Sequence, residues 1–171
     1  MNAFDKSTIH IVVPAVPALV LRSAGQSDLE LLRQWKNAQK QFFFHQQEIT
    51  QEQQLNWYES YIERPYDLML MVEFEHRLFG CMGIRWQENH WDIYNVILGL
   101  QEFGGRGLMG HAFAAMLDFA GSLKAGPISL QVLKHNPAVK WYLKQGFEIT
   151  ETHDSFFFMI FQPQPAKRAC P

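Results

Sequence analysis

A cluster of glycines between residues 104 and 110 is the part of the sequence whose residue types point most directly to ligand binding. Gly104, Gly105, Gly107 and Gly110 follow an apolar stretch that predicts a strand, and they open an amphipathic pattern that predicts a helix over 108–123. Glycines let backbone N–H groups approach a ligand closely, and a helix N-terminus adds partial positive charge. The stretch therefore predicts an anion site suited to a phosphate or a diphosphate.

Two common nucleotide-binding signatures fit this stretch poorly. A P-loop needs Lys followed by Ser or Thr after its glycines, and no such pair follows here. Gly105, Gly107 and Gly110 spell G-x-G-x-x-G, but the dinucleotide signature also needs an acidic residue about twenty positions later, and residues 129–135 contain none. For the glycines taken alone, a plain connection between a strand and a helix remains the alternative.

A second informative stretch covers residues 130–147. Asn136 suits the N-cap of a helix, Pro137 suits its first position, and Gly146 suits the residue just past its end. These signals predict a short helix over 137–145 between two strands.

Together the two stretches resemble the GNAT superfamily of acyl-CoA N-acyltransferases, in which a strand is followed by Asn, an alanine-bearing helix, a Tyr and then Gly-Phe. The corresponding residues are Val132, Asn136, Ala138, Tyr142, Gly146 and Phe147. The resemblance extends more weakly back to Leu19. It implies an N-acetyltransferase that uses acetyl-CoA as co-substrate, needs no metal, and transfers the acetyl group to a primary amine by direct attack on the thioester.

The resemblance also implies which residues hold acetyl-CoA. The glycine loop and first helical turn are expected to bind the diphosphate, the preceding strand to pair with the pantetheine arm as an added strand does, and Asn136 to hydrogen-bond the arm or the diphosphate side. The residues so assigned are Ile97, Leu98, Gly99, Gly105, Arg106, Gly107, Leu108, Met109, Gly110 and Asn136. The loop departs from the family pattern Q/R-x-x-G-x-G/A, because Gly104 replaces the basic or amide residue and Met109 replaces the last small one. Arg106 is the nearby residue that supplies charge.

The resemblance also implies that Tyr142 is the catalytic acid, and a phenol suits this role because it stays protonated at neutral pH and can donate a proton to the leaving thiolate. Its structural alternative is a core tyrosine bonded to backbone. His45, Glu48 and Asp92 are candidates for the general base, and His45 is the one assigned, since an imidazole exchanges protons near neutral pH and the segment around it is irregular. A packed histidine beside three phenylalanines is the alternative reading. Some relatives carry a Glu where this chain has Gln131, which does not take a proton.

The acceptor is suggested by residues 35–59. This run resembles the Trp-x-Asn, His and Ile-Thr pattern of the GNAT branch that acetylates amino-sugar nucleotides, and it shares features with the ribosomal-protein N-acetyltransferases. Its aromatic side chains suit stacking on a sugar or a base, or packing in the core: Trp35, Phe42, Phe43, Phe44 and Trp57. The expected acceptor is a small-molecule amine of the amino-sugar-nucleotide type. Two other functions remain as alternatives: the chain is a protein N-terminal or lysine acetyltransferase, or it is a module that binds acyl-CoA without catalysis.

Hydrophobic periodicity predicts the elements that position these residues. Capping boxes at Ser27/Glu30 and Thr50/Gln53 open helices over 27–38 and 50–63. Strands are expected at 18–22, 68–74, 78–87, 91–99, 128–133, 147–152 and 156–162, and residues 9–13 form either a strand or a loose arm. Strands paired by hairpins and also joined through helices predict an α+β fold in three layers (α/β/α), with a mixed, mostly antiparallel sheet of six to seven strands and about four helices.

Composition limits the remaining possibilities. The chain has 171 residues, 47% of them hydrophobic, which is enough for one well-filled core. A formal net charge of -2 argues against general nucleic-acid or anionic-membrane binding. Cys81 and Cys170 have no paired spacing, so neither a disulfide framework nor a zinc site is expected. Prolines interrupt the first apolar run, which predicts a cytoplasmic protein without a signal peptide or membrane span. The expected organisation is an N-terminal arm or strand (1–17), one GNAT-like domain (18–162) and a disordered tail (163–171), with a homodimer left open.

Overall fold

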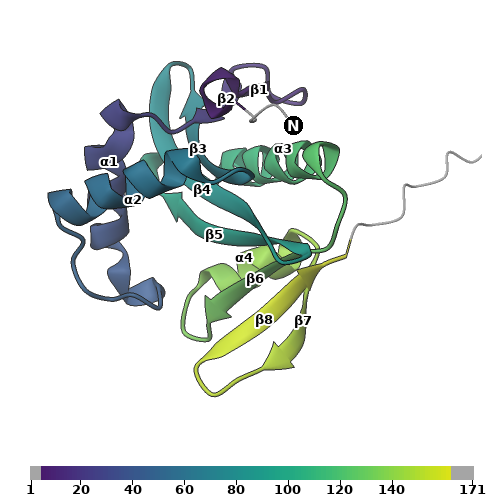
Figure 1. Cartoon of the computed structure of the whole chain (residues 1–171). Coiled ribbons are helices and arrows are strands. Elements are labelled where there is room, and N and C mark those ends of the chain that lie inside the picture. Colours follow the sequence, from purple (N-terminus) through teal and green to yellow (C-terminus); the bar gives the residue numbers. More distant parts are fainter. Residues whose placement is uncertain (1–4, 163–171) are drawn as a thin grey trace, which may run out of the picture.

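Eight strands form one sheet in the order β1-β2-β3-β4-β5-β6-β8-β7 in the computed structural model, which describes residues 5–162 (Figure 1). The strands are β1 (His10–Val12), β2 (Leu19–Ser23), β3 (Asp67–Phe74), β4 (Arg77–Gln87), β5 (His90–Leu98), β6 (Ile128–Leu133), β7 (Phe147–Thr152) and β8 (Phe156–Phe161). All neighbouring strands are antiparallel except β5 and β6, which are parallel. A parallel pair needs a crossover, and the chain between β5 and β6 supplies it as a long helix.

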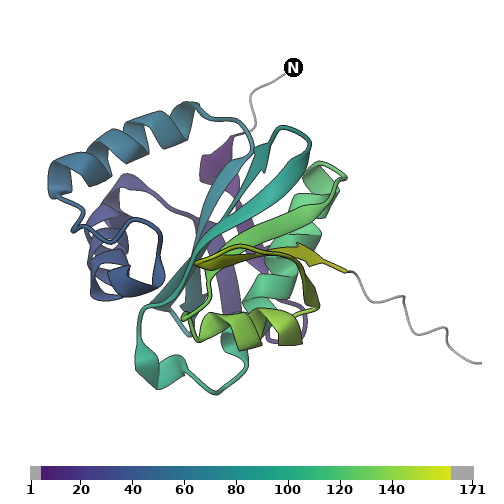
Figure 2. The same ribbon diagram turned by 90° about the horizontal axis from the view of Figure 1, so that it is seen from below.

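Four α-helices cover the two faces of the sheet: α1 (Leu29–Ala38), α2 (Gln51–Glu63), α3 (Leu108–Leu123) and α4 (Ala138–Lys144). Figure 2 shows α1 and α2 on one side of the sheet and α3 and α4 on the other, so the molecule has three layers. Short 3-10 turns at Lys6–Thr8, Gln26–Asp28, Lys40–Phe42 and Gln101–Phe103 lie in the connections.

Alternation along the strands divides the apolar residues into two cores. Met69, Cys81 and Ile97 point to the face that carries α1 and α2, where they pack with Trp35 and Tyr61. The residues that alternate with these along each strand point to the other face of the sheet, which carries α3 and α4. The largest fully buried members of that second core are Trp91, Phe79, Phe113 and Phe147.

Local signals predicted most helix ends correctly. Thr50 caps α2 through the predicted capping box, in which Gln53 N–H donates to Thr50 Oγ1 over 3.1 Å and Thr50 N–H donates to Gln53 Oε1 over 2.9 Å. The box predicted at Ser27 and Glu30 is wrong. Asp28 takes that role instead, because its carboxylate accepts the Gly25 N–H over 2.8 Å and also pairs with an arginine of β2.

The predicted three-layer α+β fold with a mixed, mostly antiparallel sheet is confirmed. The sheet has one strand more than expected, because residues 10–12 pair with β2 and extend it at one edge. The tail expected over 163–171 lies outside the described residues. None of the helices in residues 5–162 is long and apolar enough to cross a membrane.

Candidate active site

The two parallel strands β5 and β6 separate halfway along their length. They pair at Trp91–Ile128, Asp92–Ser129 and Ile93–Leu130, and the pairing stops there. From residue 94 onward, β5 pairs only with β4. One edge of β5 therefore has no neighbouring strand and faces a gap in the sheet.

A β-bulge lies in β5 where the gap begins. Gly83 pairs with Tyr94 and Cys81 pairs with Ile97, so that two residues of β5, Asn95 and Val96, lie opposite one residue of β4. Asn95 has a φ of 48°, in the left-handed region. Because the extra residue breaks the alternation of side chains, the bulge turns Asn95 toward the α1 side and Val96 toward the gap.

A cleft of about 550 Å³, the loop cleft, occupies one side of the gap. It lies between the free edge of β5, the glycine loop, the first turn of α3 and the start of α4. Its lining contains seven of the residues expected at the acetyl-CoA site: Leu98, Gly105, Gly107, Leu108, Met109, Gly110 and Asn136. Residues far apart in the sequence thus meet at one cleft.

The loop cleft presents the N-terminus of a long helix. Gly107 is the N-cap of α3 with a φ of 75°, and Gly105 has a φ of 72°. Nothing lies within 4 Å of the place where a Cβ would stand on either glycine. The backbone N–H groups of the first helical turn are therefore open to an anion, and the helix dipole favours one.

The other three residues expected to bind the cofactor do not line the loop cleft. The side chain of Ile97 is buried against α1 and lines a different cleft. Gly99 donates its N–H to Phe79 of β4 over 2.8 Å, and a Cβ at this glycine would lie 2.1 Å from the Trp35 ring. The guanidinium of Arg106 lies outside the loop cleft, 5.1 Å from the centre of an aromatic ring in β3.

Several residues that line the loop cleft were not predicted from the glycine motif. Val96 joins it through the bulge, Gln39 and Phe43 join it from the segment after α1, and Trp141 joins it from α4. Gln39 Nε2 donates to the carbonyl of Leu98 over 2.8 Å. An arm that pairs with this carbonyl must therefore share it with Gln39 or displace the amide.

Asn136 holds two segments together. Its Oδ1 accepts the Ala138 N–H over 2.9 Å at the start of α4, and its Nδ2 donates to the carbonyl of Phe42 over 3.2 Å. Next to it, the His135 ring contacts the carbonyl of Gln41 over 2.8 Å. The segment after α1 is thereby fastened across the gap to the start of α4.

A second cleft of about 400 Å³, the central cleft, continues from the loop cleft. The two share Phe42, Phe43, Val96 and Asn136. Tyr142 lines the central cleft from α4, with its ring packed against Phe113 and Phe147. Burial raises the pKa of the Tyr142 hydroxyl above its ordinary value, so the hydroxyl keeps its proton. No hydrogen bond to this hydroxyl occurs within residues 5–162, which leaves it free to donate to a ligand.

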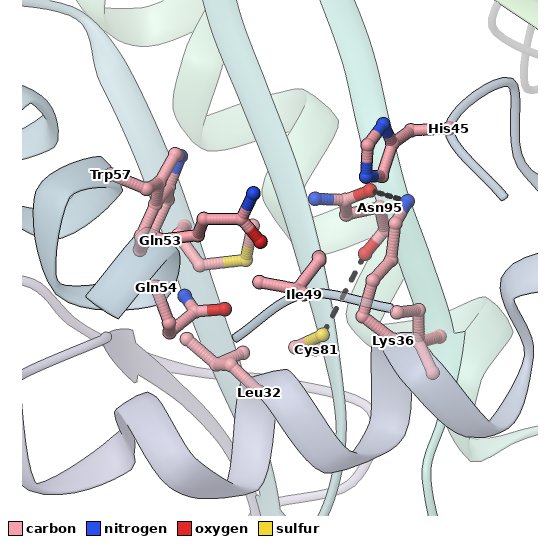
Figure 3. A pocket seen from close by; sticks show the side chains of 11 residues that line it. Leu32, Lys36, His45, Ile49, Gln53, Gln54, Trp57, Cys81 and Asn95 are labelled. Atoms are coloured by element: carbon pink, nitrogen blue, oxygen red, sulfur yellow. Dashed lines mark hydrogen bonds between the residues drawn. The ribbon is translucent and has the colours of Figure 1, made fainter. Parts of the chain in front are cut away.

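A third cleft of about 300 Å³, the inner cleft, lies between the sheet and helices α1 and α2 (Figure 3). Its lining side chains are Leu32, Lys36, His45, Ile49, Gln53, Gln54, Trp57, Met69, Cys81, Asn95 and Ile97. It meets the central cleft at Lys36, His45 and Asn95, which line both. The three clefts therefore adjoin one another, with the central cleft between the other two.

Lys36 is the principal ionisable group of the inner cleft. Its Nζ donates to Asn95 Oδ1 and lies 3.1 Å from the centre of the Phe43 ring. Burial lowers the pKa of Lys36 to about 7. The neighbouring Cys81 thiol is fully enclosed, and burial raises its pKa to about 12, so it stays protonated and unreactive. The sequence signal for Lys36 is its position one turn after Leu32, on the buried stripe of α1.

The structure separates the three candidates for the general base. His45 is exposed and lines both the inner and the central cleft. Glu48 lies on the surface and pairs with Lys40 over 3.2 Å. Asp92 lines the central cleft and pairs with Arg85 over 2.9 Å, and burial raises the pKa of its carboxyl.

The position occupied by Glu in some relatives lies in the same cleft. Gln131 lines the central cleft from β6, where its amide accepts no proton. Within residues 5–162, no group of three or more His, Cys, Asp or Glu side chains is placed to hold a metal ion.

The GNAT acetyltransferase domain family matches residues 18–148 of this chain. A spermidine N-acetyltransferase from Vibrio cholerae in complex with CoA and spermine has a similar structure, with a TM-score of 0.72 and 19% identity over 84% of this chain and 95% of that one. RimL, a ribosomal L7/L12 alpha-N-protein acetyltransferase in complex with CoA, gives 0.69 and 18% over 86% and 95%. FdhC, a nucleotide-linked sugar GNAT, gives 0.71 and 16% over 84% and 86%. No curated protein sequence matches the chain.

The buried amine of Lys36 should make the stability of the protein depend on pH. Its pKa is 10.5 when the lysine is solvated and about 7 in the folded protein, so between these pH values the unfolded chain binds more protons than the folded one. Wild-type stability therefore gains from rising pH across this window. We expect Lys36→Met to be most favourable relative to wild type below about pH 7, and this advantage to shrink as the pH rises toward 10.5.

Urea denaturation from about pH 6 to about pH 10, roughly the window between the two pKa values, measures the difference in unfolding free energy between Lys36→Met and wild type. Lys40→Met is the matched control, because Lys40 lies outside the three clefts on the surface. Any pH dependence that the control shares is a general effect of removing a lysine and is subtracted. If the difference in unfolding free energy between Lys36→Met and wild type is the same at every pH, the pKa of Lys36 is not lowered by burial.

Proposed function

Because the chain belongs to the GNAT family of acetyltransferases, we propose that it transfers the acetyl group of acetyl-CoA to the primary amine of a polar small molecule of the amino-sugar-nucleotide type. The observation that carries this proposal is the row of three adjoining clefts beside the gap between β5 and β6. A cofactor bound in the loop cleft and an acceptor bound in the inner cleft have their reacting ends in the central cleft.

The proposed cofactor position follows from the charge and the free backbone of the loop cleft. The diphosphate lies at the N-terminus of α3, against the backbone of Gly105 to Gly110, where the helix dipole favours negative charge. The pantetheine arm follows the free edge of β5 from Leu98 to Val96 and leads the thioester into the central cleft. Crystallised proteins of similar fold contain CoA, which supports this cofactor.

The acceptor is proposed from the lining of the inner cleft. This lining contains three amide side chains, the indole of Trp57, and no carboxylate. Gln54 is only 8% exposed, and its amide has no hydrogen-bond partner within residues 5–162, while Figure 3 shows it directed into the cleft. The Gln54 amide can donate and accept hydrogen bonds in the cleft, so the cleft favours a ligand with hydroxyl groups. A polyamine would need carboxylates to balance its charge.

The reacting groups are proposed on both sides of the central cleft. Tyr142 donates a proton to the thiolate of CoA as the carbon–sulfur bond breaks. His45 lies at the exposed end of the inner and central clefts, where we assign it to proton exchange with solvent. Asn136 has a positioning role, because both ends of its amide already bind backbone.

Release of free thiol from acetyl-CoA in the presence of different amines tests the proposed function. We expect a nucleotide-linked amino sugar to give a kcat/KM at least about tenfold above those of spermidine and of a peptide with an N-terminal serine, a difference of about 1.4 kcal/mol in barrier. Gln54→Leu should raise the KM for the sugar, whereas Asn56→Leu, on the exposed face of the same helix, should not.

Two outcomes contradict different parts of this proposal. A higher kcat/KM for spermidine or for the peptide overturns the acceptor. Absence of thiol release with every amine, together with no binding of acetyl-CoA in calorimetry, overturns the activity itself.

Tyr142→Phe tests the acid. The variant keeps the ring and its packing on Phe113 and removes the proton, so turnover should fall by about one to three orders of magnitude while the affinity for acetyl-CoA changes little. Turnover and melting temperature are measured on the same preparation. Turnover within about twofold of wild type in a folded variant, a barrier change of only about 0.4 kcal/mol, removes Tyr142 from the mechanism.

A further inference from the structure

Acetyl transfer requires a base, and none of the three carboxylate or imidazole candidates is enclosed and free. Asp92 is held by Arg85, Glu48 lies on the surface, and His45 is exposed. The amine of an acceptor arrives largely as ammonium and must lose a proton before it attacks the thioester. The group that takes this proton should lie where the acceptor cleft meets the cleft of the thioester.

We propose that Lys36 is the general base of the reaction, and that its uncharged Nζ takes the proton from the acceptor amine at the junction of the inner and central clefts. This inference rests on the proposed function. The lysine reaches this junction from α1, and Tyr142 reaches the central cleft from α4 on the other side of the sheet. The base and the acid therefore approach one reaction space from opposite faces.

Asn95 positions the amine of Lys36. Its Oδ1 accepts one N–H of Lys36, as Figure 3 shows, and the β-bulge of β5 fixes the direction of the Asn95 side chain. A neutral amine that donates one hydrogen to Asn95 keeps its lone pair available for a proton from the substrate. The Phe43 ring, 3.1 Å from Nζ to its centre, then stabilises the ammonium that forms.

The surroundings of Lys36 favour the uncharged form before the reaction. Burial lowers its pKa to about 7, so a large share of the amine is neutral at neutral pH. Helix α2 contributes no titratable group to the inner cleft. The titratable or charged groups that share the two clefts with it are Cys81 and Arg85 on β4, Glu88 in the following turn, His90, Asp92 and Tyr94 on β5, His45 after α1, and Tyr142 on α4.

The proposed step balances in protons and bonds. Lys36 takes one proton from the acceptor ammonium, and the free amine attacks the thioester carbon to form the carbon–nitrogen bond. The carbon–sulfur bond breaks, and the thiolate takes the proton of Tyr142. The second nitrogen proton leaves through water and restores Tyr142, while Lys36 releases its own proton to solvent past the exposed His45. The sum is one acetylated amine, one CoA thiol and one proton released.

Lys36→Arg is the decisive variant. Arginine keeps the positive charge, the long stem and a donor for Asn95, but it does not release its proton in proteins. We expect kcat/KM for the acceptor to fall by about 10²- to 10⁴-fold in Lys36→Arg and in Lys36→Met, with the affinity for acetyl-CoA unchanged. Lys40→Met, which removes an exposed lysine paired with Glu48, should keep wild-type activity.

The pH profile separates a base from a structural lysine. For two acceptors of different basicity, wild-type kcat/KM should rise with pH through a step near pH 7 that is the same for both, because it belongs to the free enzyme. This shared step should be lost in Lys36→Arg. A Lys36→Arg enzyme that keeps activity within about threefold and the same profile overturns the proposal, since such a change is under 1 kcal/mol in barrier.

Direct titration of the wild type tests the base without relying on the activity of a variant. Carbon NMR of lysines labelled at the ε position in wild type, with desulfo-CoA bound, should show one lysine that loses its proton near pH 7 and whose signal is absent from Lys36→Arg or Lys36→Met, whichever folds. A spectrum in which every lysine keeps its proton to about pH 10 overturns the proposal. Wild-type thiol release in the same preparation shows whether only the base, or the proposed function as well, has failed.

Discussion

The separation of β5 from β6 is the constraint on which the rest of the structure depends. A parallel pair that stops after three residue pairs leaves the edge of a central strand unpaired inside the protein, and its backbone groups need partners. The long crossover helix α3 begins beside that edge, and α4 begins opposite it. One interruption in the sheet thus leaves an unpaired strand edge, with a helix N-terminus beside it and clefts that adjoin one another on the two faces.

The clefts on the two faces of the sheet differ in their electrostatic character. On the α3 side, backbone N–H groups and open glycines favour an anion without a charged side chain in the cleft. On the α1 side, Lys36 is desolvated next to amides and aromatic rings, and its pKa falls to about 7. The hydrogen bond from Asn136 to the carbonyl of Phe42 fastens the segment after α1 to the start of α4, so the walls of the loop and central clefts are held together.

The sequence predicted what is encoded locally. The caps at Thr50 and Asn136, the glycines before α3 and the alternation along the strands each involve neighbouring residues, and the three-layer fold follows from them. Pairing between distant segments could not be predicted in this way. The bulge at Asn95, the burial of Lys36 and the turning of Arg106 onto the rings near β3 all depend on which elements pack together. The lysine on the apolar stripe of α1 was a further signal of the inner cleft, beside His45 and Trp57.

Hydrogen exchange of the backbone with and without acetyl-CoA tests the central claim most directly, because it reports ligand contact residue by residue. If the free edge of β5 and the N-terminus of α3 hold the cofactor, amide exchange should slow at residues 96–98 and 105–110, while the outer β7–β8 hairpin stays unchanged. Binding of acetyl-CoA that leaves exchange at 96–98 and 105–110 unaltered would contradict the account.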